Sequence, residues 1–506
     1  MATLYRNARV HSPTEPAATA MLVVGDRIAW VGADHPSAAA GADIVDLGGA
    51  LVTPAFVDAH VHLTETGLAM DGVDLTSATS RSDVLDAVAR RARQRPGEVI
   101  MGFGWDEGAW PEPRPPARAE LDRAGGGAPV YLARVDVHTA AVSSALLDAD
   151  PGIAVADGYD DGLVRRDAHH RARGAARAAL DPERVRTLRR EALLSAAKLG
   201  IGAVHEMGAP HISDADDFAA VLALGAEPDL PDVIGYWGEL HQVERARQLG
   251  AVGAGGDLNL DGSLGSRSAR LSDGYADAPG ERGMLYVGLD DATAHVVACT
   301  RAGLQAGFHC IGDEAVAMAV AAVAAAARHC GLAEVRACRH RLEHVEMLAP
   351  DLVPELARLG IAASVQPSFD ELWGGPDGMY AQRLTPERAG GLNPFGPMAD
   401  AGILLAFGSD SPVTPMSGWQ AVRAATGHHA PEHRLNTREA LAAATRGGWR
   451  AARVDDAGVL APGMLASFAV WDVPGDLVDG LPDVAAGTDP PHCRRTVVRG
   501  RTVWEG

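Results

Sequence analysis

The histidines whose spacing best suits metal chemistry are His60 and His62, at the end of the apolar run AFVDAHVHL (55–63). The run alternates apolar and polar residues as a buried strand does, so residues two apart point to the same face. On a strand these two side chains are about 7 Å apart at the backbone, close enough for both imidazoles to bind one metal ion. The pair therefore predicts metal ligands, with two histidines on an ordinary sheet face as the alternative.

Further groups that bind metals or move protons lie in or next to other strand-like runs. Counting 55–63, the chain has eight such runs, with Ala-rich helical stretches between many of them, which is typical of βα units and a parallel sheet. Eight strands predict a (β/α)8 TIM barrel, in which reactive residues gather at the carboxyl ends of the strands. The remaining runs are 200–206, 232–237, 255–263, 306–313, 339–346, 360–367 and 403–410, and their candidate ligands are Glu206, Asp257, His309, His344 and Asp410.

Several of these residues also have a purely structural interpretation. His309 could be a core histidine, and His344 could pair with a neighbouring glutamate at the rim of the sheet. Asp410 could cap a turn, and Asp257 could form an ion pair with Arg267. Because the candidates fall at successive strand ends, a shared metal site is the better interpretation.

The two ends of the chain show a different pattern. Residues 1–53 and 453–506 both repeat strand, turn and strand, and neither segment is large enough to form a core alone. We expect them to pair into one small β-sandwich beside the barrel domain, which spans 54–452. The segment 65–199 is too long for one barrel helix, so we interpret it as an inserted subdomain that folds over the barrel mouth and shapes the substrate pocket.

Composition excludes several classes of function. The 506 residues carry a formal charge of −21, which argues against nucleic acid and against an anionic membrane surface. The start shows no apolar region of signal-peptide length, and no run approaches 18 apolar residues, so we expect a cytoplasmic protein. Five scattered cysteines without C-x-x-C spacing predict reduced thiols and neither a disulfide framework nor a thiolate zinc site.

A set of motifs, taken in order, resembles the amidohydrolase superfamily. It is most similar to the family 3 branch, which includes metal-dependent hydrolases like N-substituted formamide deformylase and the exoenzyme regulators. The resemblance extends over nearly the whole chain. The motifs are PAFVDAHVHL, DVHTAAVSSALL, LDGSLGSRSARL, FHCIGDEA, RLEHVE, SVQP and FGSDSPV.

The resemblance implies a role for each strand-end residue. His60, His62 and Asp410 would bind the more buried metal, whereas His309 and His344 would bind a second metal or complete a one-metal site. Imidazole nitrogens with one carboxylate suit a divalent ion, most simply Zn²⁺, with one or two ions per chain. Asp410 and His344 would be the catalytic side chains, with Asp410 carrying the proton from water to the leaving group.

One position departs from the pattern of the branch. Relatives have a lysine four residues before the aspartate of the DGS motif, where its carbamate can bridge two metals, but this chain has Asp257 there. The single lysine of the chain, Lys198, lies in a helical stretch before the second strand. We therefore expect no carbamate bridge, and either Asp257 or Glu206 bridges the metals or the site holds one ion.

The resemblance also suggests where a substrate would bind. His138 would orient the scissile carbonyl, and Gln366 and Trp373 follow the seventh strand. Arg267 and its neighbour Arg270 could receive a substrate carboxylate as a bidentate fork, although a structural loop clamp explains them equally well. Ser143 stands where relatives often have asparagine. The candidate substrate contacts are thus His138, Arg267, Gln366 and Trp373.

These residues predict a hydrolase of a non-peptide carbon–nitrogen bond. The favoured substrate is a linear amide, an N-acyl or N-formyl amine, attacked by metal-activated water. A one-metal deaminase of a ring amidine is the first alternative, favoured by the missing lysine and disfavoured because no acid stands three residues after His309. A barrel that binds a ligand without turnover is the second. We expect a small-molecule substrate as partner, no nucleic acid and no membrane, and leave a homodimer open.

Overall fold

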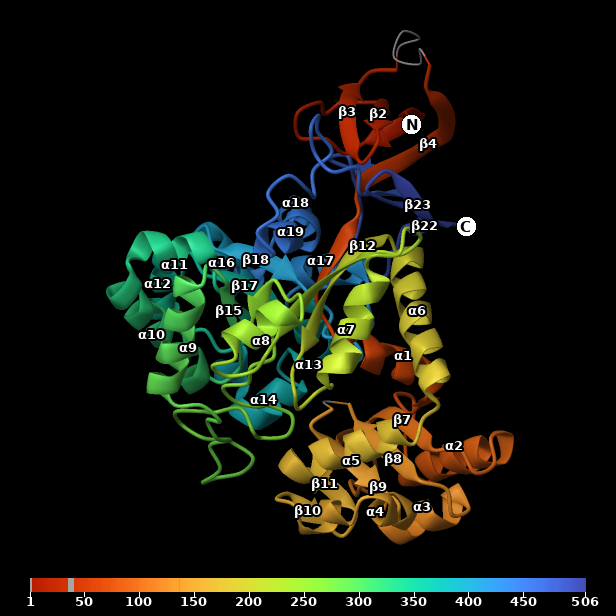
Figure 1. Cartoon of the computed structure of the whole chain (residues 1–506), viewed down its shortest axis with the longest axis vertical. Coiled ribbons are helices and arrows are strands. Elements are labelled where there is room, and N and C mark those ends of the chain that lie inside the picture. The colour runs from red at the N-terminus through yellow and green to blue at the C-terminus, as the bar shows by residue number, and fades with distance from the viewer. Residues whose placement is uncertain (1, 35–40, 136) are drawn as a thin grey trace. The chain divides into compact units, whose positions relative to one another are not determined.

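The computed structural model describes residues 2–34, 41–135 and 137–506. Its central sheet has eight parallel strands in the order β18-β17-β16-β15-β14-β13-β12-β5 (Figure 1), which confirms the predicted TIM-barrel fold. The strands are β5 (Phe56–Val61), β12 (Ile201–Gly208), β13 (Asp232–Trp237), β14 (Gly253–Ala254), β15 (Gln305–Cys310), β16 (Arg341–His344), β17 (Ala362–Val365) and β18 (Leu404–Phe407).

Backbone hydrogen bonds beyond the end of β18 join the two edges of this sheet. The N–H of Asp410 donates to the carbonyl oxygen of His60 at 2.8 Å, and the N–H of His62 donates to that of Ser411 at 2.9 Å. Both bonds use backbone groups of His60 and His62, the two histidines that the sequence predicts as metal ligands. The seam of the barrel therefore brings residues from both ends of the barrel sequence side by side.

The fourth strand differs from its prediction. A strand over 255–263 is wrong, because β14 ends at Ala254 and the chain then turns at Gly255 and Gly256, whose φ angles are +157° and +84°. A Cβ atom at Gly255 would lie 2.2 Å from the backbone nitrogen of Gly307, so this close approach requires glycine. Asp257 consequently lies on a loop.

Helices follow the strands and bury one face each. In α10 (Asp313–Cys330) the buried residues recur every three to four positions, for example Val316, Ala319 and Val323. The other helices of this unit include α7 (Ala215–Leu224), α8 (Val243–Gln248), α9 (Leu289–Arg301), α11 (Leu332–Cys338), α12 (Val353–Leu359), α13 (Pro367–Trp373), α14 (Met379–Leu384), α16 (Phe395–Asp400), α17 (Gly418–Thr426), α18 (Thr437–Ala442) and α19 (Gly448–Ala451).

The two termini share one sheet, seen in Figure 1 as red strands beside blue ones. Its order is β23-β22-β19-β4-β1-β2-β3, so the strands form one continuous sheet where two facing sheets were expected. Residues from both termini, such as Ile28, Val52 and Phe468, pack into one core beneath it. The strands are β1 (Ala2–Val10), β2 (Ala20–Val24), β3 (Arg27–Gly32), β4 (Asp43–Pro54), β19 (Phe468–Asp472), β22 (His492–Val498) and β23 (Arg501–Glu505).

A second compact unit comprises Leu63–Ala192 and His211–Asp214. Its six-stranded sheet has the order β10-β11-β9-β8-β7-β6 and two apolar clusters of its own. The predicted position of the 65–199 insertion over the barrel mouth stays a prediction. The elements are α1 (Leu63–Asp71), β6 (Val73–Asp74), α2 (Arg81–Gln94), β7 (Ile100–Trp105), α3 (Arg118–Gly125), β8 (Val130–Arg134), β9 (Thr139–Val142), α4 (Ser144–Ala149), β10 (Tyr159–Asp160), β11 (Leu163–Arg165) and α5 (Arg166–Ala178).

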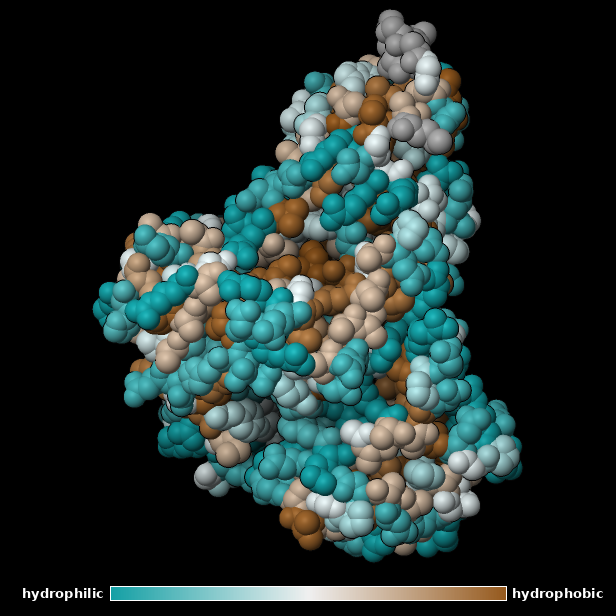
Figure 2. Space-filling model, in the orientation of Figure 1, coloured by the Kyte–Doolittle hydropathy of each residue, from teal (hydrophilic) through white to brown (hydrophobic). Residues whose placement is uncertain are grey.

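The remaining long helix, α6 (Pro182–Lys198), precedes β12 and ends at the single lysine. The ammonium of Lys198 lies 5.5 Å from the ring centre of Trp504. Within the described residues, none of the helices combines the length and the hydropathy needed to cross a membrane. Figure 2 shows hydrophilic residues spread over the visible face, with hydrophobic residues gathered in a recess over the barrel elements.

Candidate metal centre

The seam of the barrel holds two histidines and two carboxylates at ligand spacing. His60 Nε2 lies 3.4 Å from Asp257 Oδ1 and 3.5 Å from Asp410 Oδ1, and His62 Nε2 lies 3.1 Å from Asp257 Oδ2 and 3.2 Å from Asp410 Oδ1. Ligands about 2.1 Å from a tetrahedral zinc ion are about 3.4 Å from one another. Each of these four pairs of donor atoms is therefore spaced as two ligands of one ion can be.

Asp257 also contacts the two remaining histidines of the predicted set. Its Oδ1 lies 3.6 Å from His309 Nδ1 and 3.9 Å from His344 Nε2. The structural alternative for Asp257, an ion pair with Arg267, is not formed, since Arg267 pairs with Asp277 at 2.7 Å. A short carboxylate thus occupies the middle of the histidine cluster.

Two overlapping groups of donor atoms could hold an ion among the described residues. One comprises His60, Asp257 and His344, and the other His60, His62 and Asp410. Neither group includes Glu206, which is buried in β12, so its predicted ligand role stays a prediction. Both groups use His60 Nε2, and because this nitrogen has one lone pair, the two groups are alternatives for a single ion.

The residues fit a cation by their unsatisfied atoms as well as by their spacing. His60 Nε2, His344 Nε2 and Asp257 Oδ1 are buried, and none of them has a hydrogen-bond partner in the described structure. Buried polar atoms normally have partners, and these three face one another. A divalent ion would satisfy all three, and nitrogen with carboxylate oxygen is a donor set that zinc accepts.

Hydrogen bonds behind the imidazoles fix their orientation. Nδ1 of His62 donates to the carbonyl oxygen of Met207 at 3.1 Å, and Nδ1 of His344 lies 2.8 Å from Gln366 Oε1. Nδ1 of His60 lies 3.0 Å from Glu343 Oε2. With the proton on Nδ1, each ring presents an unprotonated Nε2 to the site, which is the tautomer that binds a metal.

Sequence reasoning missed the charged pair that supports His60. Arg341 and Glu343 are both fully buried inside the barrel, with Arg341 Nε donating to Glu343 Oε1 at 2.5 Å. The guanidinium also donates to the carbonyl oxygen of Ala59 and lies 4.4 Å from the ring centre of Tyr236. The period of two in RLEH, which puts both charges on one strand face, was the available signal.

Charge in the site shifts the pKa values strongly. Burial alone would raise the pKa of Glu343, but Arg341 and His60 lower it to about 2. Burial alone would lower the pKa of His62, but Asp257 and Asp410 raise it to about 10. A metal needs neutral imidazole, so binding would release protons and metal affinity should rise with pH.

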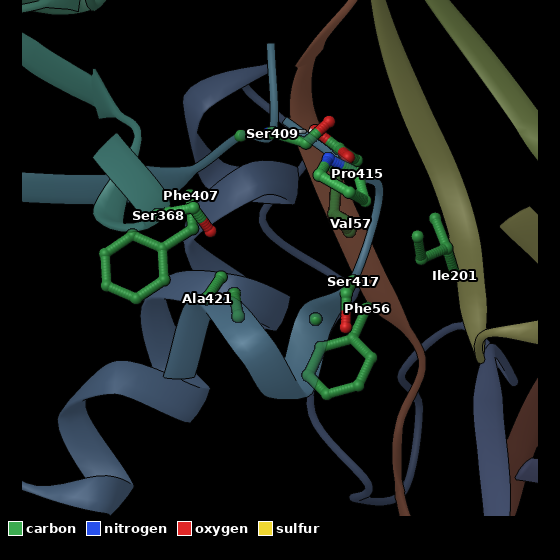
Figure 3. Close-up of a pocket in the computed structure, with 13 residues that line it drawn as sticks. Phe56, Val57, Ile201, Ser368, Phe407, Ser409, Pro415, Ser417 and Ala421 are labelled. Atoms are coloured by element: carbon green, nitrogen blue, oxygen red, sulfur yellow. Dashed lines mark hydrogen bonds between the residues drawn. The ribbon is translucent and has the colours of Figure 1, made fainter. Parts of the chain in front are cut away.

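Asp410 is held in an unusual backbone conformation, with φ at +56°. The preceding residue, Ser409, donates its N–H to Asp58 Oδ1 at 2.8 Å. Beside this contact a cavity of about 20 Å³ lies between Phe56, Phe407 and Ser417 (Figure 3). That volume holds about one water molecule, so this cavity does not accommodate a substrate.

The predicted substrate residues of the barrel unit are placed as follows. Gln366 is buried behind His344, and Trp373 packs on Phe369, with ring centres 4.7 Å apart. Phe369 in turn stacks on His344 at 6.1 Å, so Trp373 belongs to an aromatic wall beside the centre. The guanidinium of Arg267 already donates hydrogen bonds to both carboxylate oxygens of Asp277. Their contact with a substrate stays a prediction.

His138 and Ser143 belong to the second unit. Ser143 is buried, and its Oγ accepts the N–H of Val130 at 2.8 Å and donates to the carbonyl oxygen of Ala128, which is a structural role. His138 is half-buried, and Asp136, two positions earlier, lies outside the described residues. The carbonyl-orienting role of His138 stays a prediction.

A parallel barrel with a cluster of histidine and aspartate at the carboxyl ends of its strands defines the class of metal-dependent TIM-barrel hydrolases. A model of the amidohydrolase family matches residues 43–504, and the chain belongs to this family. It is therefore an amidohydrolase, a hydrolase of carbon–nitrogen bonds other than peptide bonds, as its motifs predicted.

Individual relatives agree with this assignment. Protein LONG AFTER FAR-RED 3 of Arabidopsis thaliana is 30% identical over 478 residues, 85% of this chain and 80% of the relative. N-substituted formamide deformylase of Arthrobacter pascens is 34% identical over 148 residues, 28% of this chain and 27% of the relative. The crystal structure of an uncharacterized metal-dependent hydrolase from Pyrococcus horikoshii OT3 is 25% identical, covers 95% of this chain and 99% of its own, and has a TM-score of 0.77.

Proposed function

We propose that the protein hydrolyses a linear amide, an N-acyl or N-formyl amine, with one zinc ion. The observation that carries the proposal is the group of buried, unpartnered donor atoms on His60, His344 and Asp257. Local similarity to N-substituted formamide deformylase supports the choice of a linear amide. A single ion is supported because both donor groups need the same nitrogen of His60.

A divalent ion at this centre would lower the pKa of a water molecule and polarise a carbonyl oxygen. Asp410 would accept the proton of that water and deliver it to the leaving nitrogen. It suits this task because its side chain is 12% exposed, whereas that of His60 is completely buried. Phe369 and Trp373 would exclude water from one side of the substrate.

Metal analysis and a substrate panel test the proposal. Elemental mass spectrometry of protein purified without chelators should give about one zinc per chain. The metal-loaded protein should then release amine from N-formyl and N-acyl amines, and Asp410→Asn should lower this rate by about 100-fold or more, with the metal content of the variant measured alongside. If the loaded enzyme leaves every linear amide in the panel intact, the proposed substrate class is wrong.

A one-metal deaminase of a ring amidine is the second candidate. The shared use of His60 Nε2 favours it, because it supports a mononuclear centre. Release of ammonia from ring amidines, without release of amine from linear amides, would select this function. The two products are measured on the same protein sample, so the panel separates the candidates directly.

A further inference from the structure

The barrel unit has a large cavity of about 1050 Å³ that the proposed reaction does not use. It lies between the carboxyl end of α17, the start of α18 and the hairpin of β20 (Leu477–Val478) and β21 (Leu481–Pro482). One further lining residue, Glu371, comes from α13. None of the predicted metal ligands lines this cavity.

Three arginines line the cavity, and each is anchored by a backbone carbonyl oxygen. Arg423 Nη2 donates to Thr488 at 2.9 Å, Arg434 Nε to His428 at 2.8 Å, and Arg438 Nη2 to Asp479 at 3.4 Å. Neutral carbonyl groups hold a guanidinium in place without cancelling its charge. The anchoring therefore orients three positive charges around one space.

The lining also holds three acids, Glu371, Asp479 and Asp483, but the arginines form no ion pairs with them in the described structure. Over the part of the chain that the structure describes, none of the three arginines has a carboxylate oxygen within 4 Å. Nε of Arg423 is in addition buried and lacks a hydrogen-bond partner. Two of the lining acids already accept hydrogen bonds inside the protein, Glu371 from Gln420 and Asp483 from the N–H of Ala485.

We propose that this cavity binds an organic anion with a carboxylate or phosphate group and an apolar portion. A guanidinium presents paired N–H groups that match the oxygens of either anion. The hairpin supplies the apolar side of the cavity through Leu481, Pro482, Val484 and Val478, of which Val478 is 62% exposed. This inference is independent of the reaction at the metal centre.

Calorimetric titration of the metal-loaded protein tests the proposal. The probes are 1-naphthyl phosphate, 1-naphthoate, inorganic phosphate and the neutral 1-naphthalenemethanol. We expect saturable binding of at least one naphthyl anion, and the better of the two identifies the preferred anionic group. The double variant Arg434→Gln/Arg438→Gln should bind this probe about 100-fold more weakly, since each of the two lost charged contacts contributes about one factor of ten.

Arg336→Gln is the matched control, because Arg336 is likewise anchored by carbonyl oxygens, those of Ala357 and Arg358, but lies outside the cavity. It should bind the probe like the wild type. Equal affinity of the double variant and the wild type, or equal binding of the neutral alcohol, would overturn the proposal. So would loss of binding after the metal is removed by a chelator, which would place the anion at the metal centre. Absence of saturable binding by both naphthyl anions would also refute it.

Discussion

At the scale of single residues, the centre depends on a carboxylate surrounded by four histidines. Asp257 approaches His60, His62, His309 and His344, and its Oδ1 has no hydrogen-bond donor of its own in the described structure. The nearby Asp261 is equally buried but accepts three backbone N–H bonds, from Arg270, Ile311 and Gly312. The two aspartates therefore have different roles. Asp257 is placed to bind a cation, whereas Asp261 accepts hydrogen bonds from the backbone.

Substitution of these two aspartates should separate metal binding from folding. Asp257→Asn should lose bound metal, because it removes the carboxylate at the middle of the histidine cluster. Asp261→Asn should lower the melting temperature of the metal-free protein, because an amide group cannot accept all three bonds. Elemental analysis and thermal melts check both, and full metal retention in Asp257→Asn would contradict the assignment.

Glu343 is the residue that orients His60, and its removal should weaken metal binding without touching a ligand. We expect Glu343→Gln to lower zinc affinity by about 10- to 100-fold, as is usual for a carboxylate behind a ligating imidazole. Competition with a chelating dye measures this affinity.

The same substitution leaves Arg341 buried without its partner, which destabilises the protein independently. The double variant Arg341→Met/Glu343→Gln removes this penalty and serves as the control. It should regain stability relative to Glu343→Gln, as thermal melts would show, but not regain zinc affinity. Recovery of both together would mean that Glu343 acts only through the stability of the barrel.

At the scale of elements, the loop after β14 decides where Asp257 lies. The two glycines that end the strand turn the chain, and Gly255 lies against the backbone of β15 at Gly307. If β14 continued past Ala254, Asp257 would not lie among the histidines. The position of the central carboxylate thus depends on a close contact between two backbones.

Gly255→Ala should therefore disturb both stability and metal binding. The added methyl group meets backbone atoms at a positive φ angle, so we expect a loss of about 2–4 kcal/mol and a reduced metal content. Gly303→Ala is the control, because Gly303 also has a positive φ, +66°, but has open space around its Cα. It should cost about 1 kcal/mol and leave the metal content unchanged. Denaturant unfolding measures both, and equal losses would contradict the role of the close contact.

The elements were more predictable from sequence than the contacts between them. Apolar runs and their order predicted seven of the eight barrel strands, whereas the run at 255–263 lies beyond the end of β14. The rule that reactive groups follow parallel strands brought the histidines together. The position of the Arg341–Glu343 pair beneath His60 could not be predicted, because it depends on side chains of two strands, β16 and β5, meeting inside the barrel. The partner of Arg267 was missed because the path of the 257–288 segment is not regular secondary structure.

At the scale of the whole molecule, the neutral histidines include His340 and His295, which are buried and are not candidate metal ligands. His340 accepts the N–H of Ala306 at 2.9 Å and lies 2.9 Å from the hydroxyl of Thr300. Burial lowers the pKa of His340 to about 3, and that of His295 to about 4. At these two histidines the folded protein therefore binds fewer protons than the unfolded chain in mild acid.

The contribution of these two histidines to stability should fall as the pH drops below about 6.5, where unfolded histidines take up protons. For His340 alone the loss at pH 5 is about 2 kcal/mol relative to neutral pH, because its folded pKa is about 3. His340→Asn should reduce the difference in unfolding free energy between pH 7.5 and pH 5 by this amount. The exposed His329→Asn is the control and should leave the difference unchanged. An unaltered pH dependence in His340→Asn would show that His340 is not held neutral.

The seam of the barrel has a consequence for the order of events during synthesis. It joins Val61 to Ser411, residues 350 positions apart. Contacts between such distant residues form slowly, because a long loop must close first. A ribosome must therefore release more than four-fifths of this chain before His60, His62 and Asp410 can meet, so the nascent protein has no complete metal centre until its synthesis is nearly finished.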